Sequence, residues 1–290
     1  MSYTLCVFTP TYNRAYILPK LYRSLLKQDC TDFFWMVVDD GSTDDTDRIV
    51  QDYISENKIP IQFIRIANGG KQRAWNIGVN NCDAELFMCI DSDDYLEDGA
   101  IAQLLRVWNY AKRDHNNVGV VTPRFPKNNL FPDRISLSFK DLYGKYGYRG
   151  ETCFATKTAV LKQYPFLVAE GEKFIPEVFV YDQIDCKYKH FSLNEEICLG
   201  EYLPDGYTSH YEQLLLKNPK SYAAYKRQCI DLADSKLLRL KETMLFLSWT
   251  FIAKADIRES IENLDRRTEA ALLVLPSLAL AQLINRRLKR

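Results

Sequence analysis

A cluster of carboxylates that directly follows an apolar run is the feature of this 290-residue sequence with the clearest chemistry. Residues 86–90 have the length and composition of a buried strand, and Asp91, Asp93 and Asp94 come next. Carboxylates this close together repel one another unless a cation lies between them. Oxygen ligands suit a hard cation such as Mg²⁺ or Mn²⁺, which also bridges to phosphate oxygens. The residue types therefore predict metal-assisted chemistry on a nucleotide diphosphate.

Three other predicted strands also end in residues that can bind a ligand. The first opens into residues 10–14, where an aromatic ring, hydroxyls and a cation suit a base and its ribose. The second ends in Asp39 and Asp40, where a carboxylate can accept the N–H of a pyrimidine ring. The third precedes residues 69–71, whose glycines allow close backbone approach and whose lysine supplies charge for a phosphate. Each segment alone is typical of a simple turn, but together they favour a nucleotide site.

Strand and helix patterns alternate through the first 120 residues, and these elements must position the site. Strands are predicted at residues 5–9, 33–38, 61–66, 86–90 and 118–121, with amphipathic helices between them. The helix after the second strand is predicted to begin with a capping box from Ser42 to Asp45. Alternation of this kind is typical of a parallel, doubly wound sheet, in which ligands bind at the carboxyl ends of the strands.

Composition restricts the function classes. Lys plus Arg and Asp plus Glu both total 38, so no bulk basic field favours a nucleic-acid partner. Eight cysteines show no C-x-x-C pair and no zinc spacing, which predicts free thiols in a reducing cytosol. The N-terminus lacks the basic region of a signal peptide, and no stretch reaches the roughly 18 apolar residues that span a bilayer. The sequence predicts a cytoplasmic protein.

The C-terminal tail combines an apolar helical pattern at residues 270–284 with a basic cluster at residues 285–290. This combination fits a helix that lies in an anionic membrane interface. It equally fits a terminal helix packed on the protein, with its basic end complementing the helix dipole. The first alternative predicts peripheral contact with the inner face of the cytoplasmic membrane through this tail.

The four ligand-competent segments, in this order, resemble the motifs of family 2 glycosyltransferases, of the kind that builds bacterial surface polysaccharide. The resemblance is close over residues 4–120 and looser up to about residue 210. It implies the GT-A fold, an α/β fold whose Rossmann-like, mostly parallel sheet is flanked by helices, here with a C-terminal helical extension. Changes in composition and pattern near residues 121 and 211 divide the chain into a nucleotide-sugar-binding half at residues 1–120, an acceptor-side half at 121–210 and the extension at 211–290.

The activity that the resemblance implies is inverting and metal-dependent. A hexosyltransferase of this family moves a sugar from a UDP-sugar to a hydroxyl of a glycan or lipid-linked glycan acceptor. By the same resemblance, Asp93 holds Mn²⁺ or Mg²⁺, and Asp91 faces the ribose or the metal. Asp94 ligates the metal through water or touches the sugar, while Asp40 contacts uracil with support from Asp39. The remaining donor-site residues are Pro10, Thr11, Tyr12, Arg14, Gly70, Lys71 and Ser92.

A catalytic base is needed on the acceptor side, because the acceptor hydroxyl must lose a proton as it attacks. Members of the family usually carry a Glu-Asp pair there, and this sequence does not. Glu177, which follows a proline, resembles a Pro-Glu variant of that motif and is the preferred candidate. Glu172 and Asp182 stay open as alternatives.

Two other functions remain as alternatives at this point. A nucleotidyltransferase that forms nucleotide-sugars shares a similar sheet but favours a glycine-rich basic loop after the first strand, which residues 10–14 do not provide. A non-catalytic nucleotide-sugar-binding partner is disfavoured by the intact carboxylate cluster.

Overall fold

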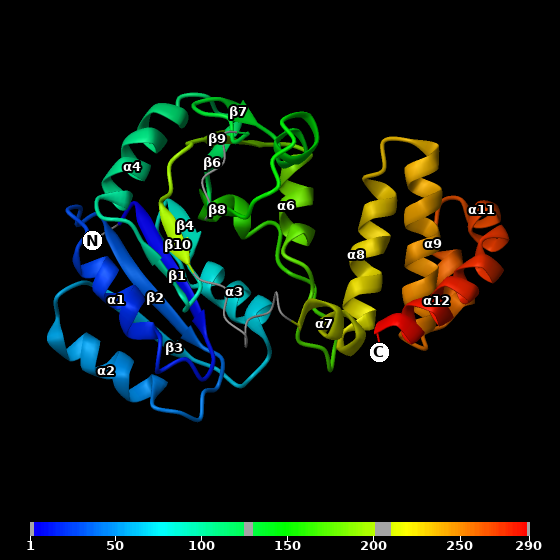
Figure 1. Ribbon diagram of the computed structural model, residues 1–290, viewed down its shortest axis with the longest axis horizontal. Coiled ribbons are helices and arrows are strands. Elements are labelled where there is room, and N and C mark those ends of the chain that lie inside the picture. The colour runs from blue at the N-terminus through cyan, green and yellow to red at the C-terminus, as the bar shows by residue number, and fades with distance from the viewer. Residues whose placement is uncertain (1–2, 125–129, 201–209, 289–290) are drawn as a thin grey trace. The chain divides into compact units, whose positions relative to one another are not determined.

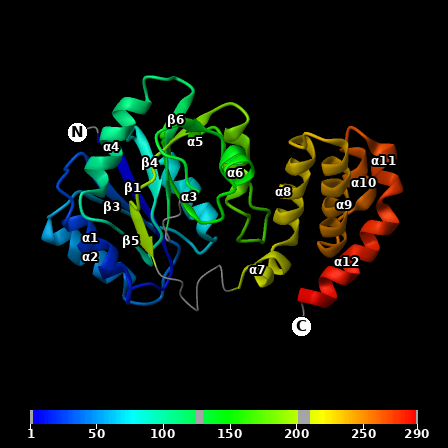
Figure 2. The ribbon, with the colours of Figure 1, turned by 45° about the horizontal axis from the view of Figure 1, so that its top comes forward.

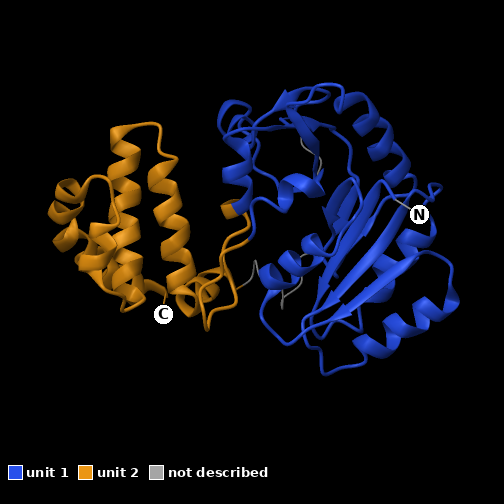
Figure 3. Ribbon diagram, turned by 180° about the vertical axis from the view of Figure 1, so that it is seen from behind, with its two compact units in different colours: residues 1–165, 180–202 blue, residues 166–179, 203–290 orange. Residues whose placement is uncertain are grey.

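The computed structural model describes residues 3–124, 130–200 and 210–288. The chain forms two compact units, and each consists of two segments (Figure 3). The first unit contains residues 1–165 and 180–202, and the second contains residues 166–179 and 203–290. The segment 166–179 therefore belongs to the second unit, although the sequence on both sides of it belongs to the first.

A sheet of eight strands, with helices on both faces, is the framework of the first unit (Figure 1). Its strands run in the order β3-β2-β1-β4-β8-β6-β9-β7. They are β1 (Leu5–Thr11), β2 (Phe33–Asp39), β3 (Ile61–Arg65), β4 (Leu86–Cys89), β6 (Asn117–Pro123), β7 (Ser136–Leu137), β8 (Thr152–Lys157) and β9 (Lys189–Ser192). A separate antiparallel pair joins β5 (Asp94–Leu96) to β10 (Cys198–Gly200).

Two helical layers cover the sheet. The helices of this unit are α1 (Leu18–Leu26), α2 (Thr46–Glu56), α3 (Lys71–Asn80), α4 (Ala100–Ala111), α5 (Thr158–Leu161), the π-helix η1 (Asp141–Lys145) and α6 (Val178–Asp185), within which the unit boundary falls. Leu18, Val50 and Leu104 bring α1, α2 and α4 into one apolar core with β1 and β2. On the other side of β1, the ring of Phe8 stacks on Phe87 at 4.8 Å between centroids.

Helix α3 packs unusually close to β1, and this fixes the helix end that enters the site. A Cβ atom added at Gly78 would lie 2.4 Å from the ring of Phe8, so only glycine allows this approach. One turn earlier, the indole of Trp75 packs edge-on against Phe87 at 5.7 Å between centroids. The N-terminus of α3, with Lys71 as its first residue, is thereby held at the carboxyl edge of the parallel strands (Figure 2).

The predicted alternation of strands and helices in the first 120 residues is confirmed, and so is a mostly parallel sheet flanked by helices. One difference concerns the strand beside β4. The alternation predicts a parallel sheet, but β8 lies between β4 and β6 and is antiparallel to both. Residues 153–155 of β8 are apolar and buried on both faces, so no local signal distinguishes a central strand from an edge strand there.

The capping box predicted for α2 is wrong. The helix begins at Thr46, and its N-cap residue Asp45 makes no side-chain capping hydrogen bond. Instead, Asp44 accepts a hydrogen bond from the backbone N–H of Thr46 at 3.1 Å. The hydroxyl of Ser42 donates to Asp39 and accepts from the backbone of Asn13, so a tertiary contact replaces the local cap.

The second unit is a helical bundle with its own apolar core. Its helices are α7 (Tyr211–Lys217), α8 (Pro219–Asp231), α9 (Lys236–Ile252), α10 (Ile257–Glu262), α11 (Arg267–Leu272) and α12 (Val274–Leu288). Phe246, Leu247 and Trp249 of α9 pack with Phe174 of the segment 166–179 in that core. Across residues 3–124, 130–200 and 210–288, none of the helices has the length and apolar character needed to cross a membrane.

Candidate active site

Three carboxylates converge where β4 ends. Asp91, Asp93 and Asp94 each offer one oxygen, and these oxygens lie within 4.8 Å of one another. The turn that gathers them is closed by a hydrogen bond of 3.0 Å from the backbone N–H of Asp94 to the carbonyl of Asp91. Hard oxygen donors at this spacing fit a divalent cation such as Mn²⁺ or Mg²⁺. The structure thus brings the predicted metal ligands together.

Lys71 offsets part of the negative charge of this cluster. Its Nζ lies 2.8 Å from Oδ2 of Asp91. Burial acts to raise the pKa of Asp91, but Lys71, together with the charges of Arg124 and Arg14, lowers it to below its usual value. Burial raises the pKa of Asp93, and the charge of Asp91 adds to this effect. The pKa values of these two neighbouring acids are therefore shifted in opposite directions, and perturbed pKa values of this kind cluster at functional sites.

Asp94 has different surroundings from the other two acids. Its side chain is buried and forms an ion pair with Arg124, which also pairs with Glu151. Burial and the charge of Asp91 raise the pKa of Asp94 to about 7, while Arg124 opposes this shift. Sequence reasoning missed Arg124 and Glu151, because both lie outside the four motifs and reach the site only through the pairing of β6 with β8.

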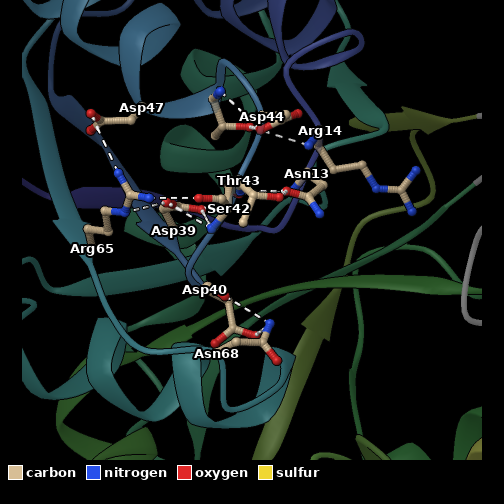
Figure 4. Close-up of polar contacts among 11 residues, drawn as sticks. Asn13, Arg14, Asp39, Asp40, Ser42, Thr43, Asp44, Asp47, Arg65 and Asn68 are labelled. Atoms are coloured by element: carbon tan, nitrogen blue, oxygen red, sulfur yellow. Dashed lines mark hydrogen bonds and ion pairs between the residues drawn. The ribbon is translucent and has the colours of Figure 1, made fainter.

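Asp40 connects the end of β2 to the glycine turn before α3 (Figure 4). Its carboxylate accepts hydrogen bonds from the backbone N–H groups of Gly69 at 2.7 Å and Gly70 at 2.8 Å. The side-chain amide of Asn68 donates to the same carboxylate at 3.1 Å. Asp40 thus organises the turn that carries Lys71, and this role is additional to the uracil contact predicted for it.

Asp39, the last residue of β2, is fully buried and binds the residues around the loop that follows this strand (Figure 4). It accepts from the backbone N–H of Ser42 at 3.1 Å and lies 3.4 Å from Nε of Arg65. Arg65 also approaches Asp47 at 3.6 Å. A buried carboxylate with these partners is well compensated.

Residues 10–14 form a fixed loop with one exposed ring. Pro10 and Thr11 are buried, whereas the side chain of Tyr12 is 47% exposed. Asn13 has a positive φ of 53°, and its side chain accepts from the backbone N–H of Thr43 at 2.8 Å. Short polar side chains such as that of Asn13 tolerate a positive φ. Asn13 therefore allows the sharp turn that leaves the ring of Tyr12 exposed to solvent.

The remaining donor-site residues lie beside these loops. The backbone N–H of Arg14 donates to Thr46 at 3.3 Å, and its side chain contacts the hydroxyl of Tyr16 at 2.6 Å. Ser92 is buried within the acidic turn. All the predicted donor-site and metal residues therefore belong to the first unit.

The three candidates for the base have distinct surroundings. Glu172 is buried, and its carboxylate accepts from the backbone N–H groups of Lys220 at 2.9 Å and Ser221 at 2.7 Å. These donors belong to the first turn of α8, so Glu172 stabilises a helix N-terminus. Glu177 is exposed and lies directly before α6, while Asp182 is partly buried within that helix.

Comparison with known proteins identifies the family. Residues 6–167, more than half of the chain, match the model of glycosyl transferase family 2. Poly(ribitol-phosphate) beta-N-acetylglucosaminyltransferase TarS of Staphylococcus aureus is 36% identical over 92 residues, which are 31% of this chain and 16% of TarS. Chondroitin synthase of Escherichia coli is 37% identical over 95 residues, or 33% of this chain and 14% of that protein. The chain thus matches only a small part of the length of these relatives.

Solved structures show the same fold at low identity. The crystal structure of TarS 1–349 in complex with UDP-GlcNAc has a TM-score of 0.60 at 17% identity, and the match covers 99% of this chain and 92% of that one. The mannosyltransferase PcManGT from Pyrobaculum calidifontis, in complex with GDP-Man and Mn²⁺, has a TM-score of 0.56 at 16% identity. This match covers 100% of this chain and 84% of that one. The predicted GT-A fold is confirmed.

Fold and acidic edge together define the class, a GT-A glycosyltransferase. Within that class the chain belongs to glycosyl transferase family 2, as its four motifs predict.

Proposed function

We propose that this protein is a metal-dependent, inverting glycosyltransferase that moves a sugar from a UDP-sugar to a hydroxyl of a glycan or lipid-linked glycan acceptor in cell-surface polysaccharide synthesis. The observation that carries this proposal is the meeting of Asp91, Asp93 and Lys71 at the carboxyl edge of the sheet, with Lys71 and Asp91 2.8 Å apart. TarS, which was solved with UDP-GlcNAc, supports a UDP-sugar donor. PcManGT, which was solved with GDP-Man and Mn²⁺, supports a nucleotide-sugar donor and a metal but not the choice of uracil.

The positive charges of the proposed donor site compensate the negative charge of the diphosphate. Asp91 and Asp93 would hold Mn²⁺ or Mg²⁺, which would supply positive charge to offset that of the departing diphosphate. Lys71 contacts the diphosphate as well, at the expense of its ion pair with Asp91. The exposed ring of Tyr12 and the carboxylate of Asp40 bind the uracil, and Pro10, Thr11, Arg14, Gly70 and Ser92 line the remainder of the donor site.

Glu177 is the catalytic base in this proposal. It removes the proton of the acceptor hydroxyl while that oxygen attacks the anomeric carbon in line. The new C–O bond forms as the bond to UDP breaks, and the electron pair leaves with the diphosphate, so the anomeric configuration inverts. Glu177 is exposed, whereas the buried carboxylate of Glu172 is occupied by two backbone donors. Residues 1–120 supply the donor side and residues 121–210 the acceptor side.

Thermal unfolding with nucleotides tests the donor class and the metal together. A ligand that binds only the folded state raises the Tm, and the increase depends on its concentration relative to Kd. We expect UDP to raise the Tm only when Mn²⁺ or Mg²⁺ is present, and we expect Asp93→Ala to abolish this increase. A larger effect with GDP, TDP or CMP would contradict the uracil assignment. Tight binding of UDP without any transfer from UDP-sugars would favour a non-catalytic partner.

The second unit offers a surface suited to a membrane. Leu272, Leu275 and Leu283 are 81%, 77% and 61% exposed, and Arg286 and Arg287 follow in the last turn of α12. Apolar side chains beside cations complement an anionic bilayer. We propose that the enzyme works at the cytoplasmic face of the membrane through this surface. The final basic residues of the predicted tail, Lys289 and Arg290, lie outside the described residues.

Vesicle sedimentation tests the membrane contact. We expect the full chain to sediment with vesicles that contain phosphatidylglycerol, and not with phosphatidylcholine alone. The double variant Arg286→Gln, Arg287→Gln is expected to lose most of this binding with little change in Tm, because both side chains are exposed. Equal binding by the variant, or a concentration-dependent dimer that buries these leucines, would contradict the proposal.

A further inference from the structure

Arg124 lies between two acids at the edge of the site. It directly follows β6, and its backbone N–H donates to the carbonyl of Glu151 at 2.8 Å. Its guanidinium forms ion pairs with the carboxylates of both Asp94 and Glu151. The side chains of Arg124 and Asp94 are only 20% and 4% exposed. Removing one partner of such a buried pair leaves an uncompensated charge, so this triad is a fixed part of the fold.

Both carboxylate oxygens of Asp94 are engaged. Oδ1 pairs with Arg124, and Sγ of Cys198 lies 3.7 Å from Oδ2. The backbone of β10 covers the pair, since a Cβ atom at Gly200 would lie 2.0 Å from Oδ1 of Asp94 and 2.8 Å from Nη2 of Arg124. Asp94 therefore cannot turn toward a cation without breaking its contacts with Arg124 and Cys198.

Asp91 and Asp93 have no comparable restraint from Arg124. Both are partly exposed, and Asp91 forms its ion pair with Lys71, whose side chain is 17% exposed. The oxygen of Asp94 is nevertheless within 4.8 Å of those of its two neighbours, close enough to join a shared ligand set. Distance alone thus does not separate Asp94 from the other two acids, and Asp91 is also engaged at both oxygens, by Lys71 at 2.8 Å and by Sγ of Cys89 at 3.9 Å. Burial separates them, because the side chain of Asp94 is 4% exposed and that of Asp91 is 36% exposed.

We propose that Arg124 is a positioning residue that holds Asp94 out of the ligand set, so that Asp91 and Asp93 alone present carboxylates to the metal. This inference rests on the proposed metal-dependent function. Two carboxylates leave coordination positions for the diphosphate oxygens of the donor, because Mg²⁺ and Mn²⁺ favour about six ligands. A third carboxylate would hold the cation more tightly in the absence of nucleotide. Arg124 therefore couples metal binding to donor binding.

A double-mutant cycle on Mn²⁺ affinity tests this arrangement without requiring turnover. Free Mn²⁺ is measured by electron paramagnetic resonance, with and without saturating UDP. We expect Asp94→Asn to lose far less Mn²⁺ affinity than Asp93→Asn, because Asp94 is not a ligand and only its nearby charge is removed. Arg124→Met is expected to bind Mn²⁺ alone about ten-fold more tightly, because it frees Asp94. The combined variant should return to the wild-type affinity.

The outcomes separate this inference from the proposed function. A loss of Mn²⁺ affinity in Asp94→Asn comparable to that in Asp93→Asn would make Asp94 a ligand and overturn the role of Arg124. Equal Mn²⁺ affinity in Arg124→Met and in the combined variant would also overturn it. If Arg124→Met shows no cooperative unfolding, Asp94→Asn against Asp93→Asn decides the question alone. Wild-type protein that binds no Mn²⁺ with UDP would instead overturn the metal site itself, and this inference with it.

Discussion

Surroundings, rather than residue type, divide the acids of this chain into separate roles. Glu172 and Glu177 are both glutamates of the segment 166–179. The first is buried and bound by two backbone N–H groups, while the second is exposed beside a helix end. The sequence alone left both open as the base, because burial and hydrogen-bond partners at this position come from α8, about 48 residues further along the chain.

Substituting the two glutamates should produce opposite effects. Glu172→Gln is expected to lower the free energy of unfolding by about 1–2 kcal/mol, because it removes a buried charge from a helix N-terminus. Its kcat should stay near wild type. Glu177→Gln should keep the wild-type Tm and the UDP affinity but lose turnover by at least about 100-fold. Denaturant titration and a UDP-release assay measure both quantities, and an active Glu177→Gln would remove the base assignment.

Lys71 provides a second prediction at this scale. Lys71→Met should weaken UDP binding in the presence of Mn²⁺ by about ten-fold, because a charge-assisted contact with the diphosphate is lost. Isothermal titration measures this affinity. Lys58→Met is the matched control, since Lys58 is exposed and pairs only with Glu56 among the ion pairs described. An unchanged UDP affinity in Lys71→Met would show that its contact with Asp91 serves only the fold.

The elements show which parts of the structure local sequence can predict. Strands that end in polar motifs were predicted to within a few residues, because buried apolar runs and the turn residues after them are local signals. The position of β8 between β4 and β6 was not predicted, since strand pairing depends on distant partners. This pairing brings Glu151 and Arg124 to the site, so both residues were missed for the same reason.

A buried histidine in β9 gives this sheet a pH dependence. His190 is 4% exposed, and its Nε2 lies 3.0 Å from the hydroxyl of Thr156 in β8. Burial lowers the pKa of His190 from 6.5 to about 3. Below about pH 6.5 the unfolded chain therefore binds a proton that the folded chain does not, and stability falls as the pH decreases toward 3.

We expect His190→Gln to reduce this acid sensitivity. Between pH 6 and pH 5, the free energy of unfolding of the wild type should fall more steeply than that of the variant, by up to about 1.4 kcal/mol per pH unit. Urea titrations across this pH range measure the two slopes. His115→Gln is the control, because His115 is exposed and should leave the wild-type slope unchanged. Equal slopes for wild type and His190→Gln would contradict the prediction.

At the scale of the whole molecule, the sequence predicted the family, the GT-A fold and the donor-side motifs, because these concentrate in residues 6–167. The division into halves at residue 120 stays a prediction. No local pattern indicates that the segment 166–179 packs with the C-terminal helices. That packing depends on Asn218, whose side chain accepts from the backbone N–H groups of Lys173 at 2.7 Å and Phe174 at 3.1 Å.

Because the second unit consists of two separate segments, it limits how chimeric proteins can be built and how recombination can exchange parts between relatives. A chain cut after residue 202 would retain the segment 166–179 but lose Asn218 and the apolar core that covers Phe174. The C-terminal helices are therefore not a cassette that can be exchanged between relatives at one junction. A chimera that keeps a cooperative unfolding transition must take both 166–179 and 203–290 from the same parent, and Glu177 is inherited with them.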